Sequence, residues 1–180
     1  MAGDTTTEAI KAGQQLHLIQ GLKTQPTRRP STGQPTSRSV HGPAPADLRV
    51  VDYIAGHVGE VVAYTQAVAP QAPPPPEQDG RVYAWMCEHT ADVEEYARRQ
   101  REALLYRHTL EHAIELHGDT HLIRKHPCPA CGCWSLMWQR GEAVCIYSRC
   151  TEDGTRRVWT LQQLAERHVA ASTYSRRRAT

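Results

Sequence analysis

Five of the six cysteines lie in residues 126–150, HPCPACGCWSLMWQRGEAVCIYSRC. Cys128 and Cys131 are two residues apart, so both thiolates can reach one ion from a tight turn that ends at Gly132. Cys145 and Cys150 form a second pair, with four residues between them. Four thiolates in two pairs are a ligand set that Zn²⁺ prefers. We therefore predict a Zn²⁺ site made of Cys128, Cys131, Cys145 and Cys150.

Such a site is closed by four protein ligands, so it is structural and leaves no position for a substrate. Metal binding of this kind contributes about 10 kcal/mol or more to folding, and the module should unfold without it. Two alternatives stay open: four unligated cysteines in a packed hairpin, or iron in place of zinc. Cys133 or His126 could also replace a cysteine ligand. Cys87 is expected to be a buried core thiol.

The cysteine pairs flank two short predicted strands, 134–139 and 143–147, which reverse at Arg140-Gly141. A hairpin with one cysteine pair at each end has the layout of a zinc ribbon. A helix should follow, because Thr160 and Gln163 form a capping box ahead of an apolar stripe. The stripe consists of Leu161, Leu164, Ala165 and Val169.

Upstream of the ribbon the chain is predicted to be helical. Residues 1–23 favour a short, marginal helix with a capping box at Thr5 and Glu8, and its stripe is Ile10, Leu16, Ile19 and Leu22. Residues 24–46 are rich in Pro, Ser, Thr and Gly, which indicates a disordered linker. A helix should begin at Asp47, as its N-cap, and end before Pro70. Its apolar positions are Leu48, Val51, Ile54, Ala55, Val58, Val61, Val62 and Val68.

The polyproline segment 70–76 is expected to be an extended spacer, or a ligand for an aromatic groove. Two further helices should start near Gly80 and Asp92, and the three helices of 47–122 fit a small bundle or a paired coiled coil. The last helix has the stripe Val93, Tyr96, Ala97, Ala103, Leu104, Leu110 and Ile114. His108 and His112, beside Glu111 and Glu115, could bind a second metal, but on an exposed acidic helix we expect them to be solvated.

Charge is distributed unevenly along the chain. The net charge is +3 for residues 1–45, −7 for 46–122 and +6 for 123–180. The basic end could neutralise phosphates of nucleic acid, or it could be a solvated tail. The arginines in question are Arg156, Arg157, Arg167, Arg176, Arg177 and Arg178.

Several classes of protein are disfavoured by the sequence. The apolar stretch 50–69 is interrupted by Asp52, His57 and Glu60, so no membrane span is expected, and the start of the chain does not resemble a secretory signal. Together with the cysteine spacing, this predicts a cytoplasmic protein. The motifs H-x-E, H-E-x-x-H and G-x-x-x-x-G-K-[ST] are absent. We therefore predict a protein that is not an enzyme and has no small-molecule substrate.

The run C-P-A-C-G at 128–132, followed by V-C-x4-C, V-W-T and a Leu/Ala helix, resembles the small, functionally unassigned zinc-ribbon proteins of actinobacteria and their phages. The resemblance covers roughly residues 80–171. It implies a zinc ribbon, the four cysteine ligands named above, and a phage or prophage origin, which would place the protein in the host cytoplasm. Some relatives continue into a helix-turn-helix, whereas this sequence ends after one helix. Sequence-specific DNA recognition is therefore not expected.

We conclude that the fold class is α+β. The mainly helical region consists of residues 1–23 and 47–122, which are separated from each other by the disordered linker 24–46. It is followed by a zinc ribbon with its helix, 123–172, and by a basic tail, 173–180. One functional hypothesis is a zinc-ribbon protein with a structural Zn²⁺ and a nucleic-acid-associated or regulatory role. The other is a protein-interaction or assembly adaptor whose zinc is purely structural.

Overall fold

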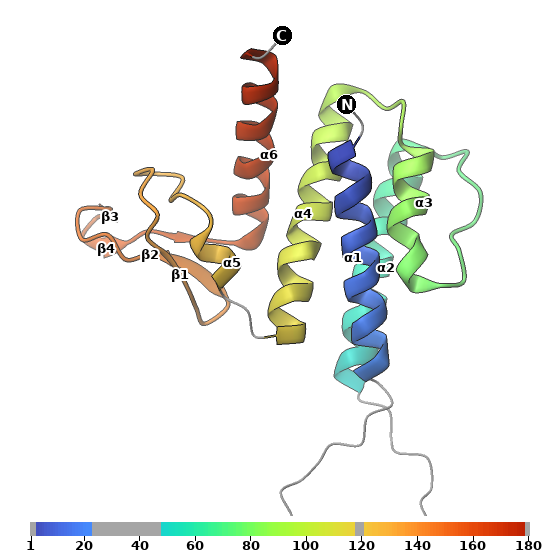
Figure 1. The fold of residues 1–180 in the computed structure, drawn as a ribbon, viewed down its shortest axis with the longest axis horizontal. Helices are drawn as coiled ribbons and strands as arrows, with labels where there is room; N and C mark the ends of the chain where they lie inside the picture. The colour runs from blue at the N-terminus through green and yellow to red at the C-terminus, as the bar shows by residue number, and fades with distance from the viewer. Residues whose placement is uncertain (1–2, 23–47, 118–120, 179–180) are drawn as a thin grey trace, which may run out of the picture.

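The computed structural model describes residues 3–22, 48–117 and 121–178 (Figure 1). The predicted linker and the N-cap at Asp47 lie outside these residues. The helices are α1 (Gly3–Leu22), α2 (Leu48–Val68), the 3-10 helix η1 (Asp79–Arg81), α3 (Val82–His89), α4 (Glu95–His117), α5 (His121–Arg124) and α6 (Leu161–Arg178). The strands are β1 (Leu136–Gln139), β2 (Glu142–Cys145), β3 (Thr151–Glu152), β4 (Thr155–Arg156) and β5 (Val158–Trp159). Helices predominate over small antiparallel sheets, which confirms the α+β class.

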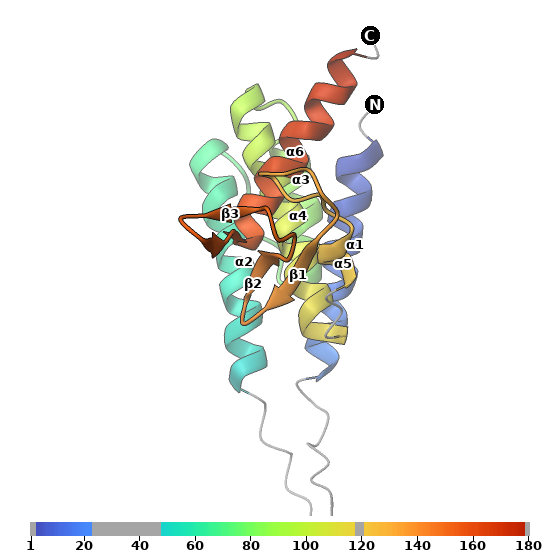
Figure 2. The same ribbon diagram turned by 90° about the vertical axis from the view of Figure 1, so that its left-hand side faces the viewer.

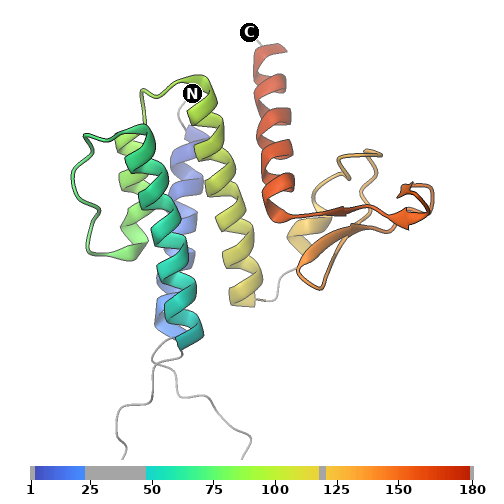
Figure 3. The same cartoon turned by 180° about the vertical axis from the view of Figure 1, so that it is seen from behind.

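Helices α1 to α4 pack around one hydrophobic core (Figures 1 and 3). Its fully buried side chains include Leu16 and Ile19 of α1, Val61 of α2, Tyr83 of α3 and Leu105 of α4. The predicted helix 47–69 corresponds to α2, although Leu48 and Ala55 of its predicted stripe are exposed. Residues 72–76 of the proline-rich segment have no helix or strand, and they link α2 to η1.

The apolar face of α1 agrees with the predicted one at Leu16 and Ile19 and differs at Ile10, and the side chain of Leu22 lies outside the described residues. The helix begins at Gly3, so Thr5 is not its N-cap, and Ile10 is 52% exposed. Its buried side chains are Ala9, Ala12, Leu16 and Ile19. Small residues let α1 approach its neighbours closely: a Cβ added to Gly13 would collide with the carbonyl oxygen of Gly80. Burial of this face in the bundle supplies the stability that a helix of this length lacks in isolation.

The buried face of α4 was predicted only in part: Ala103 and Leu110 of the predicted stripe are buried, but other positions differ. Tyr96 is 73% exposed, whereas His108 and His112 are completely buried and not solvated. Arg101 is buried as well, and it donates a hydrogen bond to the Thr90 hydroxyl at 3.0 Å. Apolar periodicity missed these positions because polar side chains can enter a core when the fold supplies hydrogen-bond partners.

The C-terminal module, from α5 to β5, contains a three-stranded antiparallel sheet in the order β1-β2-β5. Strands β1 and β2 turn at Arg140 and Gly141, whose φ angles of 52° and 86° are those of a two-residue hairpin turn of type I′. Strands β3 and β4 form a second hairpin at Asp153-Gly154, which was not predicted from the sequence. In Figure 2 the sheet faces the viewer, with α5 beside β1.

Helix α6 connects this module to the bundle. The backbone N–H of Thr160 donates to Oε1 of Gln163 at 2.9 Å, and the N–H of Gln163 donates to the Thr160 hydroxyl at 3.2 Å, which is the predicted capping box. The predicted stripe is buried throughout, and Ala165 and Val169 pack against Ala103 of α4. In the described part of the chain, every helix is too short or too polar to cross a membrane.

Candidate metal centre

A tight turn holds the first cysteine pair. The backbone N–H of Cys128 donates to the carbonyl of Cys133, and the N–H of Gly132 donates back to the carbonyl of Cys128, both at 2.8 Å. Gly132 has a φ of 72°, a left-handed conformation that glycine adopts without strain. The C-P-A-C-G sequence therefore folds back on itself, and both thiols point to the same side.

The second pair is positioned by the sheet. Cys145 is the last residue of β2, and its backbone N–H donates to the carbonyl of Arg157 at 3.0 Å. The chain then makes a loop in which the N–H of Cys150 donates to the carbonyl of Tyr147 at 2.9 Å. Cys145 and Cys150 are both buried, so the two thiols face the interior of the module.

The four thiols converge on one point. The Sγ atoms of Cys128 and Cys150 are 3.8 Å apart, as are those of Cys131 and Cys145, and all four lie within 4.8 Å of one another. A tetrahedral ion with metal–sulfur bonds of ~2.3 Å has sulfur–sulfur edges of about 3.8 Å. A disulfide would need about 2.05 Å, and all four cysteines are free. The predicted cluster is confirmed to the extent that these four cysteines could hold a metal ion.

The environment shifts the pKa values of two of the four thiols. Burial would raise the pKa of Cys128, but hydrogen bonds from the backbone N–H groups of Cys131 and Ala130 outweigh it and lower the pKa to about 7. Burial and hydrogen bonds to the other three thiols raise the pKa of Cys150 to about 12. The pKa values of these two thiols are therefore shifted in opposite directions. A bound cation offsets the repulsion between adjacent thiolates and allows full deprotonation.

Neither of the possible substitute ligands lies in the cluster. Cys133 closes the first turn through its carbonyl and is not part of the four-thiol group. His126 is buried and hydrogen-bonded through Nε2 to the hydroxyl of Tyr106 at 2.8 Å.

Ser135, which the sequence did not indicate, lies with its Oγ 3.1 Å from Sγ of Cys145 and is positioned to donate a hydrogen bond to that sulfur. Cys87 is half-buried against the bundle core, and its burial raises its pKa.

The structure describes the side chains of three of the predicted arginines. Arg156 and Arg167 are exposed, and Arg157 is half-buried with an ion pair to Glu152 at 3.5 Å. Arg176, Arg177 and Arg178 belong to the last turn of α6, and their side chains lie outside the described residues.

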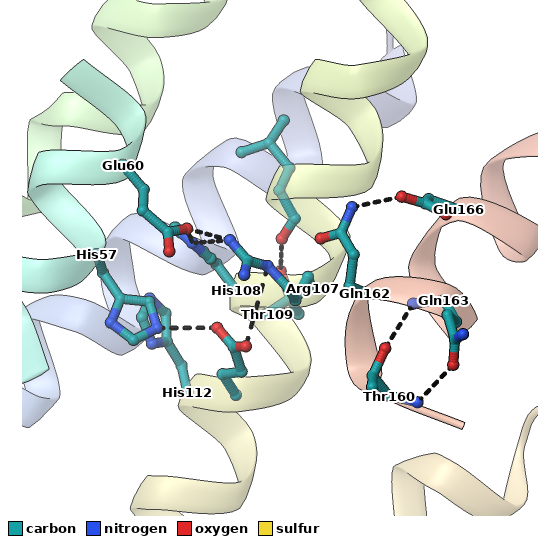
Figure 4. A network of polar contacts seen from close by, with 12 residues as sticks. His57, Glu60, Arg107, His108, Thr109, His112, Thr160, Gln162, Gln163 and Glu166 are labelled. Carbon is teal, nitrogen blue, oxygen red and sulfur yellow. Dashed lines mark hydrogen bonds and ion pairs between the residues drawn. The ribbon is translucent and has the colours of Figure 1, made fainter. Parts of the chain in front are cut away.

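A second group of potential metal ligands lies in the bundle. Ligand atoms of His57, His108 and Glu111 are within 4.8 Å of one another. Figure 4 shows the side chains of His57 and His108. The sequence indicated only the face of α4 with His108, His112, Glu111 and Glu115. The contribution of His57 was missed because it depends on how α2 packs against α4.

Comparison with protein-family models, with curated proteins and with solved structures finds no match to this chain. The resemblance to actinobacterial and phage zinc-ribbon proteins therefore stays a prediction. The function must be inferred from the geometry.

Proposed function

We propose that this chain is a non-enzymatic zinc-ribbon protein whose C-terminal module contacts single-stranded nucleic acid. The zinc is structural: it joins the turn at Cys128–Cys131 to the loop at Cys145–Cys150 and gives a small hairpin a fixed shape. The closed set of four sulfurs supports this role, since such a site leaves no coordination position for water or substrate.

The observation on which the proposal depends is a pair of exposed aromatic residues beside the cysteine cluster. Trp134 comes directly after the first cysteine turn and is 69% exposed. Tyr147 comes two residues after Cys145 and is 39% exposed. The backbone N–H of Ile146 donates to the carbonyl of Ser135 at 2.9 Å, which brings these two segments side by side. Aromatic faces held on a rigid scaffold stack with unpaired bases, at about 1–3 kcal/mol per base.

Exposed cations on the same module support this assignment. Arg149 lies in the loop with Tyr147, Arg140 is at the tip of the first hairpin and Arg156 is on β4, and all three are exposed. Phosphate contacts from such residues would make binding weaken with salt. Trp138 and Trp159, by contrast, are partly buried against the module's own core.

Fluorescence anisotropy with labelled single-stranded DNA and RNA tests this function. The zinc-loaded protein should bind at low salt, and the double variant Trp134→Ala/Tyr147→Ala should bind at least about tenfold more weakly, from the loss of two stacked bases. Tyr96→Ala is the matched control, because it removes an exposed aromatic residue on α4, away from the ribbon. Absence of binding at low salt, or equal affinity for both variants, would exclude the proposal.

A second candidate function is a protein-interaction adaptor with the same structural zinc. An open groove of ≈ 670 Å³ between α2, α4 and α6 favours it, because its lining includes Tyr64, Tyr96, Leu104 and Val169. Pull-down from the native host with and without nuclease separates the two functions. Partners that survive nuclease and are lost with Leu104→Glu would support the adaptor, and partners lost with nuclease would support nucleic-acid binding.

A further inference from the structure

Two antiparallel helices bring a pair of His-x-x-Glu sequences together in the bundle. His57 and Glu60 lie on α2, and His108 and Glu111 lie on α4, which runs in the opposite direction (Figures 3 and 4). Each histidine therefore meets the glutamate of the other helix. Nε2 of His57 is 2.9 Å from Oε2 of Glu111, and Nε2 of His108 is 3.0 Å from Oε2 of Glu60.

The outer nitrogen of each histidine is fixed by a further partner. Nδ1 of His57 donates to the backbone carbonyl of Tyr53 at 2.8 Å, and Nδ1 of His108 is 2.9 Å from the hydroxyl of Tyr83. This is the arrangement found around metal-binding histidines, in which an outer hydrogen bond sets the ring orientation and directs Nε2 toward the ion. His108 is completely buried, so its ring orientation is fixed by packing as well.

The hydrogen bonds of this cluster are one proton short. His112 extends the network with contacts of 2.8 Å to the hydroxyls of Tyr53 and Tyr83. The three histidines thus make six contacts with two hydroxyls, one backbone carbonyl and two carboxylates. Three neutral imidazoles and two hydroxyls have only five protons for these six contacts. Nη2 of Arg107, 3.2 Å from Nε2 of His108, can donate a further proton only at that nitrogen.

The contact that lacks a proton is the one between Nε2 of His57 and the carboxylate of Glu111. Nδ1 of His57 must hold the ring proton, because its partner is a carbonyl that can only accept. Nε2 is then an unprotonated nitrogen that faces an ionised carboxylate at 2.9 Å, which is repulsive unless a cation lies between them. A proton or a metal ion can supply that charge.

The charges around the cluster leave room for a cation. Arg107 forms an ion pair with Glu60, and its Nε lies 3.9 Å from Oε1 of Glu111. Two carboxylates against one guanidinium leave a net negative charge while the imidazoles are neutral. Metal ligation requires the histidine ligands to be neutral.

We propose that His57, His108 and Glu111 form a second metal site, which binds a divalent first-row transition ion such as Zn²⁺ or Co²⁺ between α2 and α4. Two imidazoles and a carboxylate suit these ions better than Ca²⁺ or Mg²⁺, which prefer oxygen ligands. Donor atoms on one ion with bonds of ~2.1 Å are roughly 3.0–3.5 Å apart, so a small movement of the side chains closes the site. Glu60 is placed to become a fourth ligand, and if it stays with Arg107 the fourth position is open.

Cobalt binding to the full chain, with the cysteine site already filled by one Zn²⁺, tests this proposal. Equilibrium dialysis should find one Co²⁺ bound per chain, and its visible spectrum should show weak d–d bands without thiolate charge transfer. Glu111→Gln is the decisive variant, because the amide can donate an N–H to Nε2 of His57 and so preserve the hydrogen bonds while removing the carboxylate. Its affinity for Co²⁺ should fall by more than the roughly 100-fold that the loss of an outer partner costs.

Glu88→Gln, at an exposed position of α3, is the matched control and should bind Co²⁺ like the wild type. If Glu111→Gln does not fold, His57→Gln replaces it as the test. The proposal is overturned if the zinc-loaded wild type takes up no Co²⁺, or if Glu111→Gln binds it as tightly. In either case a proton on His57 fills the contact, and the cluster is a hydrogen-bonded network that joins α2, α3 and α4. The outcome does not depend on nucleic-acid binding by the ribbon.

Discussion

The hydroxyl of Tyr106, on α4, lies 2.8 Å from Nε2 of His126, which precedes the first cysteine turn by two residues. The ring of Tyr106 also stacks on His168 of α6, with centroids 4.0 Å apart and an interplanar angle of 8°. Burial, reinforced by His168, lowers the pKa of His126 to about 4, so the imidazole is neutral near pH 7 and its contact with Tyr106 is a neutral hydrogen bond. Tyr106 therefore connects α4 both to the segment before the first cysteine turn and to α6.

The substitution Tyr106→Phe should destabilise the zinc-loaded protein by about 1–3 kcal/mol, because it leaves a buried nitrogen of His126 without a partner. Urea denaturation followed by circular dichroism measures the change. Tyr147→Phe is the control: its side chain is 39% exposed, and the loss of a hydroxyl there should change the free energy of unfolding by no more than about 0.5 kcal/mol. Equal urea midpoints for the two variants would show that the hydrogen bond between Tyr106 and His126 does not stabilise the protein.

Removal of the metal should unfold the C-terminal module and spare the bundle. In the proposed function the sheet module depends on metal at the cysteine cluster for its shape, whereas α1 to α4 have their own core. A chelator should therefore abolish the near-ultraviolet signal of the packed Trp138 and Trp159 while most of the helical signal remains.

Cysteine variants make the same test specific to the ligands. On the proposed assignment, Cys145→Ser should lose the zinc ion of the cysteine cluster, as measured by metal analysis after gel filtration. Cys133→Ser should retain it, because Cys133 lies outside the four-thiol group. Retention of zinc by Cys145→Ser, or its loss from Cys133→Ser, would mean that the ligand set is wrong.

The docking of α1 is tested by two glycine substitutions. Gly13→Ala would place a Cβ against the carbonyl oxygen of Gly80, so α1 must shift, and we expect destabilisation of about 1–3 kcal/mol. Gly56→Ala lies in the interior of α2 with open space around its Cβ position, and it should stabilise the protein by about 0.4–1 kcal/mol. Thermal unfolding of the zinc-loaded variants should shift in opposite directions, and a gain in stability from Gly13→Ala would contradict the packing of α1.

Short-range patterns were the features that the sequence predicted well. The C-P-A-C-G turn, the reversal at Arg140-Gly141 and the capping box at Thr160 depend on residues within a few positions of one another, and the structure contains all three. The Asp153-Gly154 hairpin had an equally clear signal, an Asp-Gly pair between short polar runs, but its strands of two residues each are too short for an alternating pattern.

The cluster around His108 could not be predicted in the same way. His57 and Glu111 are far apart in the sequence, and only the antiparallel packing of α2 on α4 brings them together. A histidine on an acidic helix indicates a solvated surface unless the partners that satisfy it are known. Here the partners are Tyr53 and Tyr83, which come from two other helices. Long-range pairing of polar groups leaves no periodic signal in a single sequence.

The capping box at the start of α6 provides the last test, since it determines how the ribbon continues into the helix that packs on α4. The Thr160 hydroxyl accepts a hydrogen bond from the N–H of Gln163, and without it that N–H would lose its partner at the helix terminus. Thr160→Ala should cost about 1 kcal/mol of stability, while Thr160→Ser, which retains the hydroxyl, should cost only a fraction of that. Urea unfolding of the zinc-loaded variants measures both values. If the alanine and serine variants were equally stable, the cap would not contribute, and burial of Leu161, Leu164 and Val169 would alone determine where α6 begins.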